Sequence, residues 1–180
     1  MGNKYVSLLR GINVSGHRKI KMADLKFLYE ELSCENVITY IQSGNVIFEH
    51  ISDDPATIKN EIETAIEEKY SFDVYVNVLH AEEFKNILLE LPFDNINLEQ
   101  DGTKFLITFL ESNLDSSHVE LLSGYVKEPE KVVLKNNALY LHCPNGYGKT
   151  KLSNALIENK LKTKATTRNL KTVTKLCQMI

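Results

Sequence analysis

The order of the predicted strands and helices is the feature that most restricts the folds open to this 180-residue chain. Its first half reads β-α-β-β-α-β, with segments predicted at 4–12, 22–32, 36–43, 46–50, 54–70 and 74–79. After a helix near 81–91 a similar order returns, with segments at 104–111, 114–126, 131–135, 138–142 and 150–162. We therefore predict an α+β fold of two tandem ferredoxin-like (βαββαβ-type) subdomains, with an extra C-terminal helix.

The subdomain boundaries follow from this repeat and from a polar, turn-rich segment between the halves. Residues 1–80 are predicted to form the first subdomain, 81–103 a helix and linker, and 104–180 the second subdomain with the C-terminal helix. The first strand of each half reads apolar on both faces, as the consecutive Leu8 and Leu9 illustrate. Each sheet is therefore expected to be covered on both sides, which leaves loops and helix ends for a ligand.

Charge is strongly segregated along the chain, although the formal net charge is only −3. Residues 1–26 hold six Lys or Arg and one acid, and residues 149–180 hold eight Lys or Arg and one acid. The middle of the chain holds the other seven bases and 22 acids. A long nucleic acid is usually met by a domain that is basic overall, so this balance favours a local anionic ligand or a narrow contact strip.

Three predicted helices begin with basic residues, although the partly positive N-terminus of a helix favours acids. These openings lie at 18–22, 148–151 and 166–169. The other three predicted helices begin conventionally, near Asp54, Glu82 and Asp115. Because cations beside exposed N–H groups attract an anion, the basic openings predict anion binding.

The loop after the first strand carries the densest set of candidate ligand-binding residues. They are Arg10, Asn13, His17, Lys19 and Lys21. Backbone N–H groups and cations in this loop could converge on a phosphate or a carboxylate. The alternative is a solvated loop whose bases balance the acidic middle of the chain, since an unfavourable dipole contact costs only ~0.3–1 kcal/mol.

Two further segments add candidates, each with a structural alternative. Gln42, Ser43 and Asn45 have amide and hydroxyl groups that can orient a polar ligand, but Ser-Gly-Asn is also ordinary hairpin chemistry. Lys149 follows a glycine-rich turn that could bind an anion through its N–H groups, and the alternative is a simple turn with Thr150 as a helix cap.

Arg168 and Asn169 complete the set of candidate ligand-binding residues. A guanidinium close to a helix start suits a bidentate oxyanion, and Asn169 could orient the ligand. The alternative for Arg168 is a buried ion pair with an acid of the middle segment.

The sequence indicates no metal site, no cofactor and no assignable catalytic residue. Cys34, Cys143 and Cys177 are too few and too widely spaced for a disulfide framework or a zinc site, and the histidines show no metal spacing. His142 and Cys143 are adjacent on a predicted strand, so they point to opposite faces and cannot act as a base and nucleophile pair. With no secretory signal and no membrane anchor predicted, we expect a cytoplasmic protein with reduced thiols.

Four ordered motifs resemble a known family. They are the segments 8–14, 21–22, 39–46 and 167–169 with Thr172 and Val173. Together they resemble the bacterial family called domain of unknown function 1697 (DUF1697), over residues 5 to about 176. The resemblance implies paired α+β subdomains of the ferredoxin-like kind, and it implies no activity.

Three functions are compatible with these observations. The leading hypothesis is a cytosolic protein that binds a phosphate-bearing or other anionic ligand, such as a nucleotide or a short nucleic-acid element, between the subdomains. Its ligand would be held by Arg10, Lys19, Lys21 and Arg168 and oriented by Asn13 and Asn169.

The second hypothesis is an enzyme acting on a small phosphorylated or carboxylated metabolite. Arg10 and Arg168 would hold the oxyanion and His17 would carry the proton. The third is an interaction module whose basic ends dock on an acidic surface, and the sequence leaves the oligomeric state open.

Overall fold

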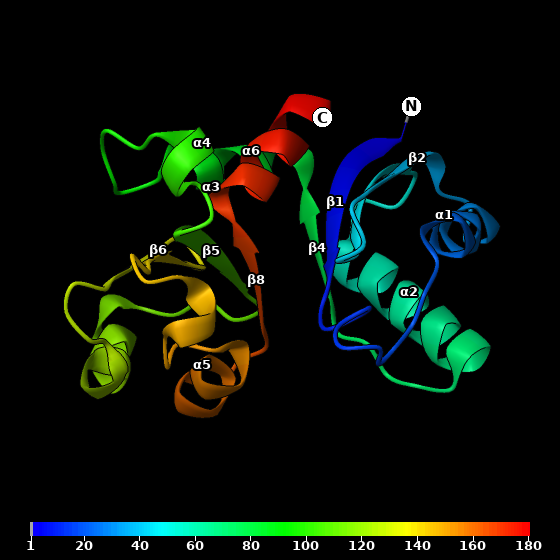
Figure 1. Cartoon of the computed structure of the whole chain (residues 1–180). Coiled ribbons are helices and arrows are strands. Elements are labelled where there is room, and N and C mark those ends of the chain that lie inside the picture. Colours follow the sequence, from blue (N-terminus) through cyan, green and yellow to red (C-terminus); the bar gives the residue numbers. More distant parts are fainter. Residues whose placement is uncertain (1) are drawn as a thin grey trace. The chain divides into compact units, whose positions relative to one another are not determined.

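The computed structural model describes residues 2–180, and the chain divides into two compact units (Figure 1). The first unit comprises the described residues up to Lys85 with Met179–Ile180, and the second comprises Asn86–Gln178. Each unit contains one four-stranded antiparallel sheet together with helices. The protein is therefore of mixed α and β structure, as the sequence predicts.

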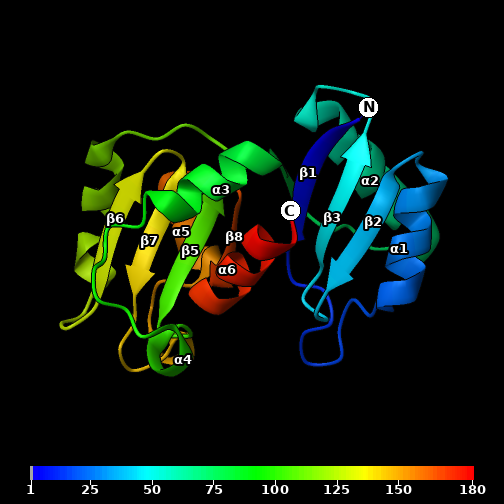
Figure 2. The ribbon, with the colours of Figure 1, turned by 90° about the horizontal axis from the view of Figure 1, so that it is seen from above.

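The first unit is built from six elements around its sheet. They are β1 (Asn3–Leu9), α1 (Met22–Glu31), β2 (Glu35–Tyr40), β3 (Asn45–His50), α2 (Pro55–Tyr70) and β4 (Val76–His80). The strand order is β2-β3-β1-β4, which Figure 2 shows in part. The central strand β1 pairs antiparallel with both neighbours, so Ser7 lies opposite Val46 on one side and Val78 on the other. The next helix, α3 (Ala81–Leu89), follows β4 directly, and the division between the units falls within it.

The core of the first unit lies between the sheet and the helices α1 and α2. The stripe Ile58, Ile62 and Ile66 is buried, which confirms the helical spacing read from the sequence. Each such side chain contributes roughly 1.5–3 kcal/mol through burial. Asp54 caps α2 by accepting hydrogen bonds from the backbone N–H groups of Ala56 and Thr57. On β1 every residue from Tyr5 to Leu9 is buried, so both faces of this strand are covered.

The second unit repeats the strand order of the first. Its elements are α4 (Leu98–Asp101), β5 (Phe105–Leu110), the 3-10 helix η1 (Ser116–Tyr125), β6 (Lys131–Lys135), β7 (Ala138–His142), the 3-10 turn η2 (Tyr147–Lys149), α5 (Asn154–Leu161), β8 (Ala165–Asn169) and α6 (Leu170–Met179). The antiparallel sheet has the order β6-β7-β5-β8. Apolar side chains of β5, β7, η1 and α5 form its core, with Leu122 and Ile157 fully buried.

One strand and two helix starts differ from the sequence prediction. Residues 166–169 were expected to open the last helix, but they belong to the strand β8, and α6 begins only at Leu170. The cap is Asn169, whose Oδ1 accepts a hydrogen bond from the backbone N–H of Thr172. Pairing with β5, which places Thr167 opposite Thr108, outweighs the local capping signal of the threonines.

The helix expected at 150–162 begins at Asn154 and is capped by Ser153 rather than by Thr150. Lys149 therefore ends the short turn η2 and lies outside α5. The helix expected at 114–126 is a 3-10 helix, capped by Asp115.

In the part of the chain that the structure describes, no helix has the length and apolar character needed to cross a membrane.

Candidate functional site

The loop that leaves β1 folds back on itself in an unusual conformation. The backbone N–H of His17 donates to the carbonyl of Val14 at 2.9 Å and closes a tight turn. Its two central residues, Ser15 and Gly16, have φ angles of 49° and 80°, as in the turns that favour hairpins. Asn13 and Arg18 also have positive φ, at 56° and 46°. A left-handed backbone costs roughly 1–2 kcal/mol at a residue other than glycine, and such strain gathers at functional sites.

Asn13 holds this loop together through its side-chain amide. Its Oδ1 accepts a hydrogen bond from the backbone N–H of Ile20, and its Nδ2 donates to the carbonyl of Ile20, both at 2.9 Å. The same Nδ2 donates to the carbonyl of Gln42 at 2.9 Å. The side chain of Asn13 is therefore committed to positioning the loop against the turn between β2 and β3.

The segment around Ile20, which the hydrogen bonds of Asn13 hold in place, presents two lysines beside the start of α1. Ile20 is 2% exposed, whereas its neighbours Lys19 and Lys21 are exposed. Lys21 is the N-cap of α1 in an extended conformation, and its side chain makes no capping hydrogen bond. Of the three basic helix openings expected from the sequence, this is the one that the structure forms.

The turn between β2 and β3 packs against the start of this loop. The carbonyl of Gly44 accepts from the backbone N–H of Leu9 at 2.8 Å, so the turn lies directly against the start of the loop. Asn45 is buried, and its Nδ2 donates to the carbonyl of Tyr40 at 2.9 Å and to Ser43 Oγ at 3.0 Å. The side chains of Ser43 and Asn45 thus stabilise the turn, as the structural alternative expects.

Loop, turn and helices line an open pocket of about 510 Å³ in the first unit. It is lined by Asn13, Gly16, Lys19, Ile20, Lys21, Asp24, Gln42 and Tyr70. Four of the residues predicted to bind a ligand, Asn13, Lys19, Lys21 and Gln42, are brought together here. Asp24, in the first turn of α1, and Tyr70, the last residue of α2, were not predicted.

Most polar side chains of this pocket are not committed to other protein groups. Among residues 2–180, the side chains of Lys19, Lys21, Asp24 and Gln42 make no ion pair or hydrogen bond. The hydroxyl of Tyr70 is buried and has no hydrogen-bond partner within the same range. Burial, and secondarily the carboxylate of Asp24, raise the pKa of Tyr70, so this hydroxyl stays protonated at neutral pH.

Two other predicted residues of the first unit lie outside this lining. The backbone N–H of Arg10 donates to the carbonyl of Tyr75 at 2.9 Å, which ties the end of β1 to the segment before β4. His17 is exposed at the tight turn. The pocket therefore contains no histidine, and the proton-carrying role predicted for His17 stays a prediction.

The remaining predicted residues, Lys149, Arg168 and Asn169, belong to the second unit. Arg168 is 8% exposed on β8 and donates through Nη1 to Thr166 Oγ1 and to the carbonyl of Thr167, both at 3.0 Å. Burial lowers the pKa of Arg168 to about 10, which still leaves it charged at neutral pH. Asn169 caps α6, and Lys149 is exposed on η2.

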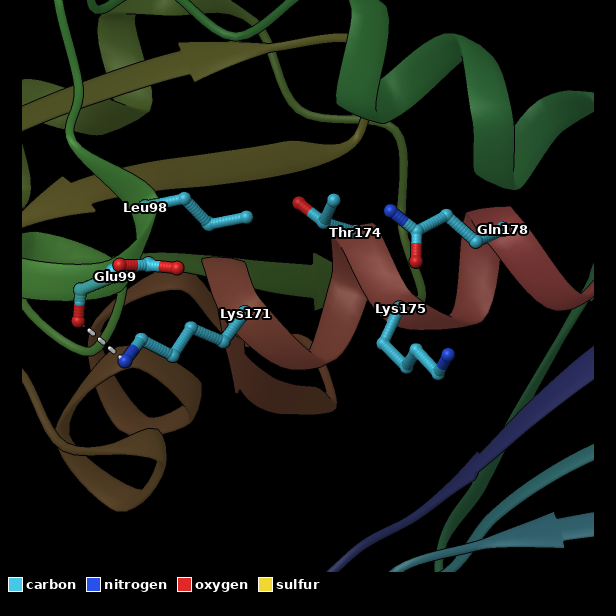
Figure 3. A pocket seen from close by; sticks show the side chains of 6 residues that line it. All are labelled: Leu98, Glu99, Lys171, Thr174, Lys175 and Gln178. Carbon is cyan, nitrogen blue, oxygen red and sulfur yellow. Dashed lines mark hydrogen bonds between the residues drawn. The ribbon is translucent and has the colours of Figure 1, made fainter.

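The second unit has a smaller groove of about 250 Å³ between α4 and α6 (Figure 3). It is lined by Leu98, Glu99, Lys171, Thr174, Lys175 and Gln178. Lys171 Nζ donates to the carbonyl of Glu99 at 2.6 Å, as the dashed line in Figure 3 marks. This lysine therefore fastens α4 to α6, and none of the predicted residues lines the groove.

The comparisons with known proteins give a family and a fold. The family model described as "Protein of unknown function (DUF1697)" matches residues 2–140. The chain belongs to this family. The match includes the motifs at 8–14, 21–22 and 39–46, which build the pocket of the first unit, and it ends before the motif at 167–169.

A solved structure agrees over nearly the whole chain. It is described as the conserved bacterial protein SP0830 from Streptococcus pneumoniae, is 28% identical and has a TM-score of 0.76. The similarity covers 99% of each chain. No curated protein matches the sequence. Family membership therefore comes without an assigned activity.

Proposed function

We propose that this DUF1697 protein binds a phosphate-bearing or other anionic small ligand, such as a nucleotide, in the pocket of the first unit. The observation that carries the proposal is the convergence of Lys19, Lys21 and the start of α1 on one pocket. Unpaired N–H groups at a helix N-terminus attract anions, and the helix dipole adds about 0.3–1 kcal/mol. The pocket volume of about 510 Å³ lies within the range of small-molecule sites.

The double change Lys19→Ala with Lys21→Ala is expected to weaken anion binding about tenfold or more. Each ammonium contact to a phosphate contributes roughly 0.5–1.5 kcal/mol at this exposure, and about 1.4 kcal/mol is a factor of ten in affinity. Titration calorimetry with inorganic phosphate, ribose 5-phosphate and AMP measures the change. The affinity of the parent protein should also fall as salt rises from about 0.05 M to about 0.5 M.

The matched control is Lys4→Ala with Lys26→Ala. Both lysines belong to the basic N-terminal segment but lie outside the pocket, so the control removes the same charge. Affinity in this variant should stay within about twofold of the parent. Equal losses in the two double variants would mean that net charge, and not the pocket, attracts the ligand.

We further infer that the two units are tandem ferredoxin-like subdomains of a cytosolic protein. Each unit has the order strand, helix, two strands, helix, strand, and the two sheets share one strand order. Burial raises the pKa of Cys34 to about 12 and that of Cys143 to about 11, so both thiols stay protonated. Such thiols are compatible with a reducing compartment.

A further inference from the structure

The sheet of the first unit has two ends that differ in charge. β1 and β3 are antiparallel, with Leu8 opposite Asn45, so β1 ends where β3 begins. Figure 2 shows the loop after β1 and the turn between β2 and β3 together at this end, and the arrowhead of β3 at the other. The first end, called the basic end below, carries Arg10, Arg18, Lys19 and Lys21 against Asp24 and Asp73. Arg18 and Asp73 pair with each other at 3.4 Å, so the two exposed lysines give this end its positive charge.

The opposite end of the same sheet, called the acidic end below, carries exposed carboxylates. They belong to Asp53, Asp54, Glu82 and Glu83. His80 is the last residue of β4, and its Nε2 lies 3.8 Å from Asp53 Oδ1, so the start of α3 lies beside the loop before α2. The base of β1, Lys4, lies opposite Glu49, so this end is net negative.

Both ends also expose large apolar side chains. At the acidic end Ile51, which follows β3, is 88% exposed. At the basic end Val14 is 58% exposed and Ile41 is 48% exposed. Val14 and Ile41 are the chain neighbours of Asn13 and Gln42, which a hydrogen bond of 2.9 Å joins, so they share one part of the surface.

Ile41 has a backbone conformation that isoleucine disfavours. Its φ is 49°, in the left-handed region that asparagine adopts readily and β-branched residues rarely do. Half of the side chain is exposed, so core packing does not account for an isoleucine at this position. Because strained backbone gathers at functional sites, this residue indicates contact with a partner.

The charge of the first unit argues against two anionic partners. Residues 1–85 hold nine Lys or Arg and 14 acids, so a long nucleic acid or an anionic membrane would meet a net negative unit. A second copy of the chain would instead bring an acidic surface that is local and that carries its own exposed isoleucine.

We propose that copies of this chain associate head to tail, with the acidic end of one first unit on the basic end of the next. Ile51 of one copy packs against Val14 and Ile41 of its partner, and the carboxylates around Ile51 meet the lysines of the basic end. Because the two surfaces differ, each added copy leaves one surface of each kind open, and the assembly grows with concentration.

This association goes beyond the ligand-binding function, although both use Lys19 and Lys21. Val14, Ile41 and Ile51 do not line the pocket. Ile51→Lys acts at the far end of the sheet and should therefore leave the affinity for inorganic phosphate within about twofold of the parent. Self-association and phosphate binding can thus fail independently of each other.

The test is sedimentation equilibrium of the full chain between about 0.02 and 1 mM, because small interfaces are weak. The average mass of the parent should rise steadily with concentration and should fall when salt is raised from about 0.05 M to about 0.5 M. Ile51→Lys removes the apolar contact and sets a cation against the lysines, so association should weaken at least about tenfold. Ile41→Asn with Val14→Asp should weaken it as much from the basic end, since asparagine keeps the left-handed backbone.

An equimolar mixture of these two variants tests the head-to-tail arrangement. Each variant keeps one intact surface, so the mixture should form a 1:1 dimer and no larger species. A symmetric contact through either surface alone would leave one of the variants associating with itself. The control is Leu89→Lys, the same kind of change at a residue of the second unit that is 81% exposed, and it should associate like the parent.

Three results would overturn the proposal. They are a parent that stays monomeric up to about 1 mM, a mixture that stays monomeric while the parent associates, and equal association of Ile51→Lys and Leu89→Lys. A monomeric parent that sediments with phosphatidylserine vesicles would assign the basic end to an anionic membrane instead.

Discussion

Gly44→Ala is expected to destabilise the first unit by about 2–5 kcal/mol. A methyl group on Gly44 would lie 2.7 Å from Ile12 Cδ1 and 2.8 Å from Leu9 Cβ, which is closer than real contacts allow. The φ angle of +74° adds conformational strain for any side chain. Overpacking costs about 1–3 kcal/mol and the left-handed backbone about 1–2 kcal/mol, which together give the expected loss. The free energy of unfolding in urea measures it.

Two other glycines separate these causes. Gly146 has a φ of +91° and no atom within 4 Å of an added methyl group, so Gly146→Ala should lose only the backbone part, about 1–2 kcal/mol. Gly124 has open space and no positive φ, and Gly124→Ala should change stability by less than about 0.5 kcal/mol. If Gly44→Ala lowered the free energy of unfolding no more than Gly146→Ala does, the turn would not be closely packed against β1.

The sequence predicts most elements of the fold because local periodicity determines them. The stripe Ile58, Ile62 and Ile66, together with the cap at Asp54, is enough to locate α2. The strand β8 is different, because it has only five residues and its threonines are also good helix caps. Its identity depends on pairing with β5, from Leu106 opposite Asn169 to Leu110 opposite Ala165, and local patterns do not contain that pairing.

Some residues of the candidate site can likewise be recognised from local sequence patterns, whereas others are brought together only by the fold. The loop lysines and Gln42 carry recognisable chemistry in the sequence, so they could be predicted as candidates. Asp24 and Tyr70 come together only because the start of α1 and the end of α2 meet at one pocket. A signal for Tyr70 did exist, since it continues the buried stripe of α2 by one further step of four residues. For the segment of Arg168, the predicted helix start was wrong, because this segment is a buried strand.

Asn13→Asp is expected to lower the stability of the first unit by about 2–4 kcal/mol. Aspartate has nearly the same shape and tolerates a φ of 56°, so the change removes hydrogen bonds without adding backbone strain. It still accepts from the backbone N–H of Ile20, but it cannot donate to the carbonyls of Ile20 and Gln42, which lie 2.9 Å away. An unsatisfied, partly buried carbonyl costs about 1–3 kcal/mol, and the carboxylate repels both oxygens. Urea unfolding measures this loss.

The same change should weaken AMP binding about tenfold, because Asn13 sets the position of the segment that carries Lys19 and Lys21. Asn95→Asp is the matched control, since Asn95 also has a φ of 56° and its side chain makes no hydrogen bond within the described range. Its stability should change by less than about 0.5 kcal/mol. Similar stability in the two variants would show that the three hydrogen bonds of Asn13 contribute little. A destabilised Asn13→Asp variant that still bound AMP at parental affinity would instead show that the ligand orders the lysines without the hydrogen bonds of Asn13.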